Sequence, residues 1–517
     1  MKIGGELRRF QENSDFPTFL KPLVTFADIL DFPDDEPQTV QARVDPVTGQ
    51  STGTYRHFRT TEFGLFVQDD WKVTPRLTLN IGLRYDNFGT LKENDGLLST
   101  IVFPASGSLA DASIVEVDEI YQRDNNNFAP CFGFAWDPFG DGRWAVRGGA
   151  GVFYSRIWTN FSGNSRFNPP HSLAVSLSGA QARAVYGFDF NGDPAFARPL
   201  DARGGSTVFR PTAQTIDQNL RAPYVTEWFL GAQRQLPGNW MAEVNYVGSS
   251  GRKLLLRQEI NRFSGDTADG VTNRVNLSFG SITHGFNAVS SIYHGLAAQL
   301  QKRFSDGYTA QIAYTFSRSI DTDSEPFGGG AGELQGTMDV GNIALDRGLS
   351  AFDATHRLAA NFIYEALFLR GRNDLAGSVL GGWQIGGILS MQSGFPLTIT
   401  TSSDFNQDGV ASDRPNLVGS LNRVVGHSPQ DFLNGAFGDP TQLGSLFRPA
   451  GLGTNGNLGR NVFRGPGYAT FDLSLMKSFG LPWFTNERSR FEFRAEIFNV
   501  FNRVNLRAPS VSLGSFS

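Results

Sequence analysis

The sequence predicts an all-β protein, an antiparallel transmembrane β-barrel with long loops at one end. Segments of about ten residues alternate between apolar and polar side chains, the pattern of strands with two different faces. The connections between these segments alternate between short and long. The chain of 517 residues contains 59 glycines and 45 phenylalanines, and 13% of it is aromatic. This composition is typical of many short strands joined by tight turns.

The alternation is clearest in RLTLNIGLRYD, where Leu79, Ile81 and Leu83 point one way and Asn80 and Arg84 point the other. A strand of a spanning barrel needs only about 9–11 residues of this kind. A soluble β-sandwich uses the same alternation, so the strands alone do not decide between the two. We expect thirteen strands near residues 2–10, 62–71, 76–89, 128–138, 143–155, 223–235, 239–248, 289–304, 307–319, 355–367, 381–392, 468–479 and 489–500.

The connections favour the membrane barrel. Bacterial barrels have short periplasmic turns and long extracellular loops, whereas a sandwich has no reason to keep its long loops at one end. The short connections are expected at 72–75, 139–142, 237–239 and 305–307, with longer ones at 368–380 and 480–488. The long connections are expected at 11–61, 90–127, 156–222, 249–288, 320–354 and 393–467, as exposed loops rich in Gly, Asn, Asp, Ser and Pro.

Two kinds of side chain fit this arrangement. Aromatic residues beside the short turns would form an interfacial girdle at headgroup depth. Charged residues that alternate with apolar ones would face the lumen, either to contact a plug or cargo or as an internally paired wall. The girdle candidates are Trp71, Phe139, Trp144, Trp240, Phe304, Tyr308, Trp383, Phe479 and Trp483. The lumenal charges are Arg84, Asp86, Glu492, Arg494 and Glu496.

Bulk properties exclude several other classes. No stretch approaches the roughly 18 consecutive apolar residues of a transmembrane helix. The net charge of -5, without runs of Lys or Arg, gives no footprint for nucleic acid. Cys131 is the only cysteine, which excludes an internal disulfide and a thiolate metal cluster. The expected partner is therefore outer-membrane lipid rather than nucleic acid.

Four segments carry a family resemblance: FGLFVQDDWKVTPRLTLNIGLRYD (63–86), FEFRAEIFNVFNRVN (491–505), GYATFDLSLMKSF (467–479) and DFNQDGVASDRPN (404–416). They resemble TonB-dependent outer-membrane receptors, and most of all the Oar-like group with its carboxypeptidase-regulatory-like domain. The resemblance implies a barrel of about 22 strands plugged by an N-terminal globular domain. It also implies opening by the TonB complex, driven by the inner-membrane proton gradient. Typical cargo of the family includes ferric siderophores, cobalamin, oligosaccharides and peptides.

The whole chain, 1–517, is expected to be one receptor-like β-barrel domain and a fragment. The opening MKIGGELRRF alternates like a strand and lacks the regions of a secretory signal peptide. A TonB box and a plug are also not recognisable. Thirteen or fourteen strands are fewer than the family's number, and GSFS ends too soon for a final inward strand. We therefore expect the signal peptide, TonB box, plug and last strand to lie outside this sequence.

The leading hypothesis is active transport across the outer membrane, with the solute unidentified. An alternative is a surface-binding or adhesion protein that uses the barrel as an anchor. A third is a soluble secreted β-protein. Neither G-x-S-x-G nor a P-loop is present, and the histidines fit no H-x-x-x-H spacing. We therefore expect no enzyme and no required cofactor.

One segment predicts a metal site. Asp404, Asn406 and Asp408, followed by Gly409, form D-x-N-x-D-G, the first half of a calcium-binding loop. The twelfth position holds Pro415 instead of the usual glutamate, so Asp413 is expected to substitute. The alternative is an Asx-rich loop whose carboxylates cap their own backbone. A weaker echo, DFNGD, occupies 189–193.

Overall fold

The structure is a computed structural model that describes residues 1–16, 19–186, 194–262, 273–325, 337–339, 341–368, 375–401, 403–408, 413–419, 446–480, 490–509 and 512. Residues 189–193, Gly409, Trp483 and the turn after residue 480, all considered above, lie outside these ranges.

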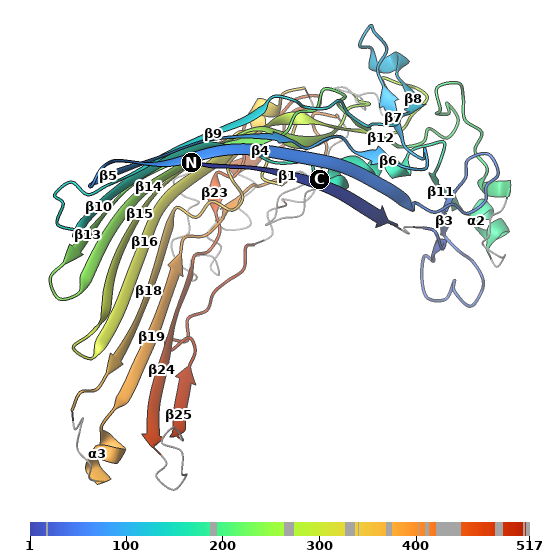
Figure 1. Cartoon of the computed structure of the whole chain (residues 1–517). Helices are drawn as coiled ribbons and strands as arrows, with labels where there is room; N and C mark the ends of the chain where they lie inside the picture. The colour runs from blue at the N-terminus through green and yellow to red at the C-terminus, as the bar shows by residue number, and fades with distance from the viewer. Residues whose placement is uncertain are drawn as a thin grey trace.

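Among the described residues, one large sheet of sixteen strands has a main path of thirteen antiparallel strands, which we call the wall, and each of these pairs with the next along the path. All thirteen predicted strands are thereby confirmed in sequence order. Figure 1 shows the wall as a strongly curved sheet. Its strands are β1(Lys2–Ser14), β4(Arg56–Thr74), β5(Leu77–Asn87), β9(Asn127–Trp136), β10(Trp144–Tyr154), β13(Tyr224–Leu236), β14(Trp240–Glu259), β15(Ile282–Ser305), β16(Tyr308–Asp321), β18(His356–Glu365), β19(Trp383–Gln392), β24(Tyr468–Gly480) and β25(Arg490–Ile497).

The register gives the wall one apolar and one polar face. Val67 lies opposite Leu83, and Gly64 lies opposite Asp86, so each strand pair keeps like side chains on the same side. Large apolar side chains stay exposed on the first face, with Leu65 at 58% and Ile3 at 71% of their full accessibility. An exposed apolar face of this extent fits a lipid environment, and we call it the outward face.

Four wall strands are clearly longer than predicted, and the first of them, β1, continues to Ser14 instead of ending near residue 10. β4 begins at Arg56 rather than near 62, β14 continues to Glu259, and β15 begins at Ile282. The predicted loop 249–288 is therefore partly strand. The register of β14 shifts between Gly251 and Leu254, where Lys253 has a φ of 53°. This bulge breaks the alternation, so the strand beyond it was not recognisable as a continuation.

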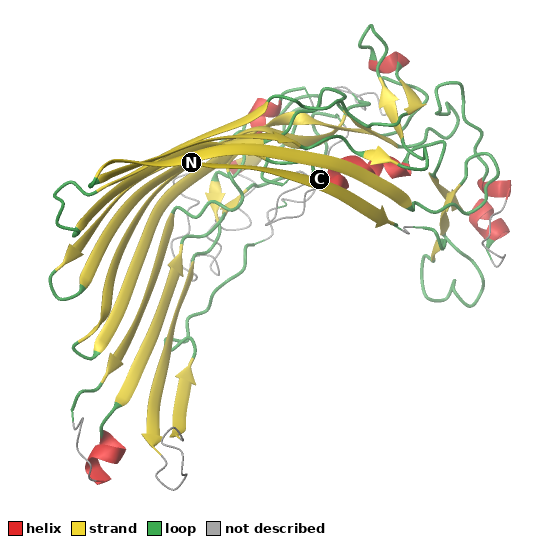
Figure 2. Ribbon diagram, in the orientation of Figure 1, coloured by secondary structure: helices red, strands yellow, loops and turns green. Residues whose placement is uncertain are grey.

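The long connections gather at one end of the wall, where they fold into small sheets and helices that we call the loop layer (Figures 1 and 2). Their predicted position at one end is confirmed, whereas their prediction as exposed loops holds only in part, because several of their apolar residues are buried. The strands are β2(Leu23–Thr25), β3(Thr39–Val44), β6(Lys92–Glu93), β7(Ser99–Val102), β8(Ser113–Glu116), β11(Leu173–Ser178), β12(Ala213–Ile216), β17(Gly348–Leu349), β20(Pro396–Leu397), β21(Asn416–Leu417), β22(Phe447–Arg448) and β23(Phe463–Arg464). The helices are η1(Leu109–Asp111), α1(Thr159–Ser162), η2(Gly163–Phe167), α2(Ala180–Val185), η3(Pro194–Phe196) and η4(Ile343–Asp346).

Hydrophobic clusters hold the loop layer together. The sheet β11-β3-β2 buries Val40, Val44 and Leu177 with Val185 of α2. A second cluster joins wall residues Phe58 and Leu255 to loop residues; its other members are Leu91, Leu98, Ile120, Tyr121, Phe161, Ile216 and Leu220. Two further clusters are centred on Phe463 and on Phe279. These apolar side chains are buried away from water and contact one another, as in the hydrophobic core of a globular protein.

The opposite end of the wall carries the short connections. One of them contains the helix α3(Leu375–Leu380) within the predicted turn 368–380. Among the described helices, none is long and apolar enough to cross a membrane. Strands β1 and β25 form the two ends of the hydrogen-bonded path among the described residues. The count of 22 strands and the closure of the barrel therefore stay predictions.

Candidate functional site

The polar face of the wall, which we call the inward face, carries the charges predicted to line the lumen. Arg84 Nη2 lies 2.7 Å from Asp86 Oδ1 and 3.5 Å from Glu6 Oε2. Arg494 Nη2 lies 2.5 Å from Glu496 Oε1. These charges pair with one another, as the alternative of an internally paired wall predicted.

The loop layer folds over the inward face where the wall meets it. Phe58 on β4 belongs to this face, because it lies opposite Glu12 of β1. It is 1% exposed and shares a cluster with Phe161 of α1. The guanidinium carbon of Arg166 stands 4.9 Å from the centre of the Phe58 ring. The connection 156–167 is thus anchored against the inner side of the wall.

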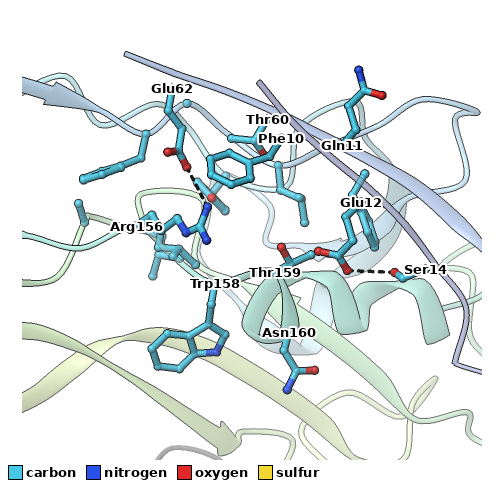
Figure 3. A pocket seen from close by; sticks show the side chains of 18 of the residues that line it. Phe10, Gln11, Glu12, Ser14, Thr60, Glu62, Arg156, Trp158, Thr159 and Asn160 are labelled. Atoms are coloured by element: carbon cyan, nitrogen blue, oxygen red, sulfur yellow. Dashed lines mark hydrogen bonds and ion pairs between the residues drawn. The ribbon is translucent and has the colours of Figure 1, made fainter. Parts of the chain in front are cut away.

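This anchoring leaves a cavity of about 480 Å³ between β1, β4 and the connection that contains α1. Figure 3 shows it from close by, with Phe10, Glu62 and Arg156 on one side and Glu12, Ser14 and Thr159 on another. Aromatic rings and carboxylates dominate its lining. The aromatic residues are Phe10, Phe16, Phe58, Phe88, Tyr121 and Trp158; the charged ones are Glu12, Asp15, Glu62, Asp124, Arg156 and Arg166.

The two arginines of the cavity already have partners. Arg156 Nη1 lies 3.6 Å from Glu62 Oε1, and its guanidinium carbon lies 4.2 Å from the centre of the Phe10 ring. Arg166 donates hydrogen bonds to the Ser14 carbonyl and to Ser14 Oγ, at 3.3 and 3.0 Å. Glu12 accepts a hydrogen bond of 3.0 Å from Ser14 Oγ. The lining therefore offers more carboxylate than guanidinium charge, beside flat apolar surfaces.

A second hollow, of about 470 Å³, lies further along the inward face over β9, β10 and β13. Apolar side chains line it although most of this face is polar. Phe153, Phe229 and Val247 are 53%, 44% and 40% exposed there. Phe229 lies directly opposite Gly149, where an added Cβ would come within 3.1 Å of the ring. The glycine thus lets the aromatic ring lie flat on the wall.

The structure brings the predicted calcium ligands together. Asp404, Asn406 and Asp408 lie on one turn, because Asp408 N–H donates to Asp404 Oδ1 at 3.1 Å and to Asn406 Oδ1 at 3.0 Å. Asp413 returns to the same turn, where its Oδ2 accepts from the backbone N–H groups of Phe405 and Asn406, at 2.5 and 2.9 Å. Asn406, Asp408 and Asp413 are at most 1% exposed.

The electrostatics of this turn are unusual for a loop. Burial, together with the nearby negative charges of Asp404 and Asp408, raises the pKa of Asp413 to about 6. The hydrogen bonds from Asn406 and Phe405 oppose this shift. The Asx-turn bonds of the alternative interpretation are therefore present, and three carboxylates lie on or beside the same turn.

Sequence reasoning missed a compact cluster of His57, Glu93 and Asp95, whose ligand-type atoms all lie within 4.8 Å of one another. Within the part of the chain that the structure describes, the three carboxylates of the 404–413 loop do not meet this spacing. Glu93 is already occupied by backbone N–H groups of His57, Asp95 and Leu97, and His57 Nδ1 lies 2.5 Å from Asp95 Oδ2. The cluster closes a loop by hydrogen bonds, and no local spacing could have revealed residues so far apart.

The chain is similar to several known proteins. The chain is 24% identical over 323 residues to the TonB-dependent transporter Oar of Myxococcus xanthus, a match that covers 58% of this chain and 27% of that protein. Among solved structures, the outer membrane transporter YddB from Escherichia coli matches at 12% identity and a TM-score of 0.42, over 87% of this chain and 51% of that one. The FrpB iron transporter from Neisseria meningitidis (F3-3 variant) matches at 13% identity and a TM-score of 0.42, over 98% and 54%.

The matched regions thus span about a quarter of the length of Oar and about half of the two transporters of known structure. The match to Oar agrees with the resemblance found in the sequence. The family model described as "outer membrane beta barrel domain" matches residues 1–517. The chain therefore belongs to the outer membrane β-barrel family and is a protein of the outer membrane.

Proposed function

We propose that this chain is the barrel portion of a TonB-dependent transporter, which takes up a solute too large or too scarce for porins. A plug domain would occupy the lumen, and the TonB complex would release it at the expense of the proton gradient. The relative Oar is a transporter of this kind by name. In this reading the protein is a carrier and not an enzyme, and residues 1–517 are a single domain of a larger polypeptide.

The observation that carries the proposal is the cavity on the inward face. A surface anchor needs only an outward face for lipid and loops for its partner. Here the connection 156–167 folds into the inner side instead, and leaves a partly open pocket of about 480 Å³ between wall and loop. This volume lies within the range of small-molecule sites, about 300–1,000 Å³. A site on the inner side of the wall suits a solute on its way through.

The apolar hollow supports the plug. Phe153 and Phe229 are exposed on a face that lipid does not reach, and exposed apolar patches mark contact surfaces. A globular domain inside the lumen would cover them. The hollow lies on the wall itself, away from the loop layer, where such a domain would sit.

The lining of the cavity suggests the solute's chemistry. Rings such as Phe10 and Trp158 offer flat apolar surfaces, and Glu12 and Asp15 offer hydrogen-bond acceptors. A solute with flat apolar faces and several hydroxyl or amino donors would match both. An oligosaccharide or a peptide fits this description better than a polyanion does.

The test is uptake by cells that lack the gene, supplied with wild-type or variant protein. Depletion of a mixed oligosaccharide and peptide medium would be followed by mass spectrometry, with and without a protonophore. We expect at least one solute to disappear only with the gene and only with an intact proton gradient. In the double variant E12Q/D15N this uptake should fall about tenfold or more, because lost charge-assisted bonds contribute roughly 1.5–3 kcal/mol.

The matched control is D111N, an exposed carboxylate of the loop layer that pairs with Arg203 outside the cavity. It should leave uptake unchanged. If no solute depends on the gene, and its loss instead abolishes attachment of the cells to a surface, the barrel-anchored adhesion protein is the correct function.

A further inference from the structure

The turn formed by residues 403–408, together with Asp413, occupies a junction of the loop layer. It belongs to the connection between β19 and β24 and touches the segment 337–339 from the connection between β16 and β18. Asn406 Nδ2 donates to the Met338 carbonyl at 2.6 Å, and Asn455 Nδ2 donates to Asp339 Oδ2 at 2.6 Å. Gly453 N–H donates to the Phe405 carbonyl at 2.7 Å. Three separate stretches of chain thus meet around this turn.

The turn assembles oxygen atoms of the kind that a hard cation prefers. The carboxylates of Asp404, Asp408 and Asp413 and the amide oxygen of Asn406 all come from one short segment. Their positions are 1, 3, 5 and 10 of a calcium-binding loop, counted from Asp404. Ca²⁺ takes six to eight oxygen ligands in flexible geometry, whereas Mg²⁺ demands a near-ideal octahedron. An irregular set of this kind favours Ca²⁺.

An independent observation is that one buried carboxylate oxygen of this turn lacks an interaction partner. Asp413 is 1% exposed, and its Oδ1 has no hydrogen-bond partner. A buried carboxylate oxygen without a partner costs free energy, about 1–3 kcal/mol or more for a charged group. The next residue, Arg414, turns away from it: its guanidinium donates to Asp346 Oδ1 at 2.5 Å and to the Leu458 carbonyl at 2.7 Å.

We propose that Asp404, Asn406, Asp408 and Asp413 bind a Ca²⁺ ion, which fastens the 337–339 segment and the 446–464 segment to this turn. Ligands on opposite sides of the ion can stand nearly 5 Å apart, at Ca–O distances of about 2.3–2.6 Å. Binding would therefore draw the three carboxylates together. The inference does not depend on the proposed transport function, because a loop layer of any surface protein could use such a clamp.

The site should be of low affinity. The bidentate glutamate of a high-affinity loop is replaced by Pro415 at the twelfth position, and Asp413 acts two residues earlier. Extracellular calcium modules bind with dissociation constants of about 10⁻⁴–10⁻³ M. We expect a value in that range, suited to the outside of a cell.

The test is hydrogen exchange of the full-length natural protein, purified from outer membranes in detergent and freed of metal. Amides of residues 337–339, 403–408 and 446–458 should become protected as Ca²⁺ is added, with a midpoint at about 10⁻⁴–10⁻³ M. Terbium luminescence gives an independent measure of binding. Magnesium at the same concentrations should produce neither effect.

The variants D408N and D413N keep the shape of the side chains but remove a charge, so both should lose the calcium-dependent protection. The matched control is D45N. Asp45 caps its own turn, where Oδ1 accepts from Val47 N–H at 3.0 Å and Thr48 N–H at 2.8 Å, and the calcium response should persist in this variant. Electrophoresis of unboiled samples shows that each variant barrel is folded. Calcium without effect up to about 10 mM in folded wild-type protein, or a response equally lost in D45N, would overturn the proposal.

Discussion

The wall and the loop layer place their apolar side chains in opposite ways. In the wall, Ile3 and Leu65 are 71% and 58% exposed, and polar side chains face the interior. In the loop layer, Val40 and Leu98 are fully buried beneath polar loops. The two regions of this chain are therefore suited to two different environments, lipid for the wall and water for the loop layer. The wall leaves its apolar face to lipid and satisfies its backbone by strand pairing, whereas the loop layer must bury apolar area away from water.

The two regions also differ in where their charged side chains lie and in how these are paired. At the short-turn end, the outward face of the wall places cations beside tryptophans. Lys302 pairs with Trp240 and Lys477 with Trp383, and Arg234 lies 4.8 Å from the Trp144 ring centre. The predicted girdle of Trp71, Trp144, Trp240 and Trp383 at headgroup depth fits this arrangement and stays a prediction. The loop layer instead buries its cations in ion pairs: Arg414 pairs with Asp346 at 2.5 Å, and Arg460 pairs at 2.8 Å with Asp321 at the loop end of wall strand β16.

The largest effect is expected for the buried charges of the loop layer. The change R460M leaves Asp321, 3% exposed at its side chain, without its ion-pair partner and removes the bond from Arg460 to Ser324 Oγ. Breaking a buried pair in this way costs about 3–5 kcal/mol. We expect rapid proteolysis of the loop layer, while the wall keeps its heat-modifiable band. The exposed pair Arg203–Asp111 provides the control, because R203M should cost only about 0–1 kcal/mol.

The second prediction concerns a charge placed on the apolar outward face of the wall. Val67 and Gln68 are neighbours on β4 at one depth, with Val67 outward and Gln68 inward. An arginine that faces lipid near mid-depth costs about 2–4 kcal/mol. V67R should therefore reduce the folded barrel recovered from outer membranes, whereas Q68R should not. Equal loss in both variants would mean that the outward face is misassigned.

The same comparison shows what the sequence could and could not predict. Alternation is local, so all thirteen wall strands and the outer-membrane location were predicted and are confirmed, as β5 and β25 illustrate. The loop layer depends on contacts between distant residues. β3 pairs with β11, which follows it by more than a hundred residues, and neither strand stands out by pattern. Only tertiary folding brings such segments together.

The two candidate sites also differ in whether the sequence could predict them. Asp404, Asn406, Asp408 and Asp413 share one short segment, so their spacing could be read directly, although their metal stays a proposal. The cavity draws its lining from β1, β4, the segment around Tyr121 and the connection 156–167. Its residues are individually ordinary, and only the inward fold of the loop makes them neighbours. A local pattern therefore could not have predicted it.

A smaller effect is expected at the lipid interface of the wall. Lys302 Nζ donates to the Gly238 carbonyl at 3.0 Å and to Ser305 Oγ at 2.5 Å, and lies 4.4 Å from the centre of the Tyr308 ring. Bonds of a charged group contribute roughly 1.5–3 kcal/mol, but Lys302 is only 1% exposed, so a methionine buried in the same place offsets part of this loss. K302M should thus lower the urea midpoint of the barrel modestly. K2M, at a lysine that is 71% exposed, should leave it unchanged.

The smallest expected effect is a dependence of stability on pH, which we expect in the loop layer and not in the wall. Burial lowers the pKa of His171 in the loop layer; Glu116, whose Oε1 lies 3.2 Å from Nε2, and Glu93 oppose the shift, and Arg56 adds to it. A histidine with a lowered pKa in the folded state binds fewer protons than in the unfolded state. Its stabilising contribution is therefore complete above the unfolded pKa of about 6.5 and is lost as the pH falls below it. Proteolysis of the loop layer should accelerate between about pH 7 and about pH 5 in wild-type protein and less in H171Q, while the heat-modifiable band of the wall stays constant. An acceleration of the same size in H171Q would show that other groups cause it.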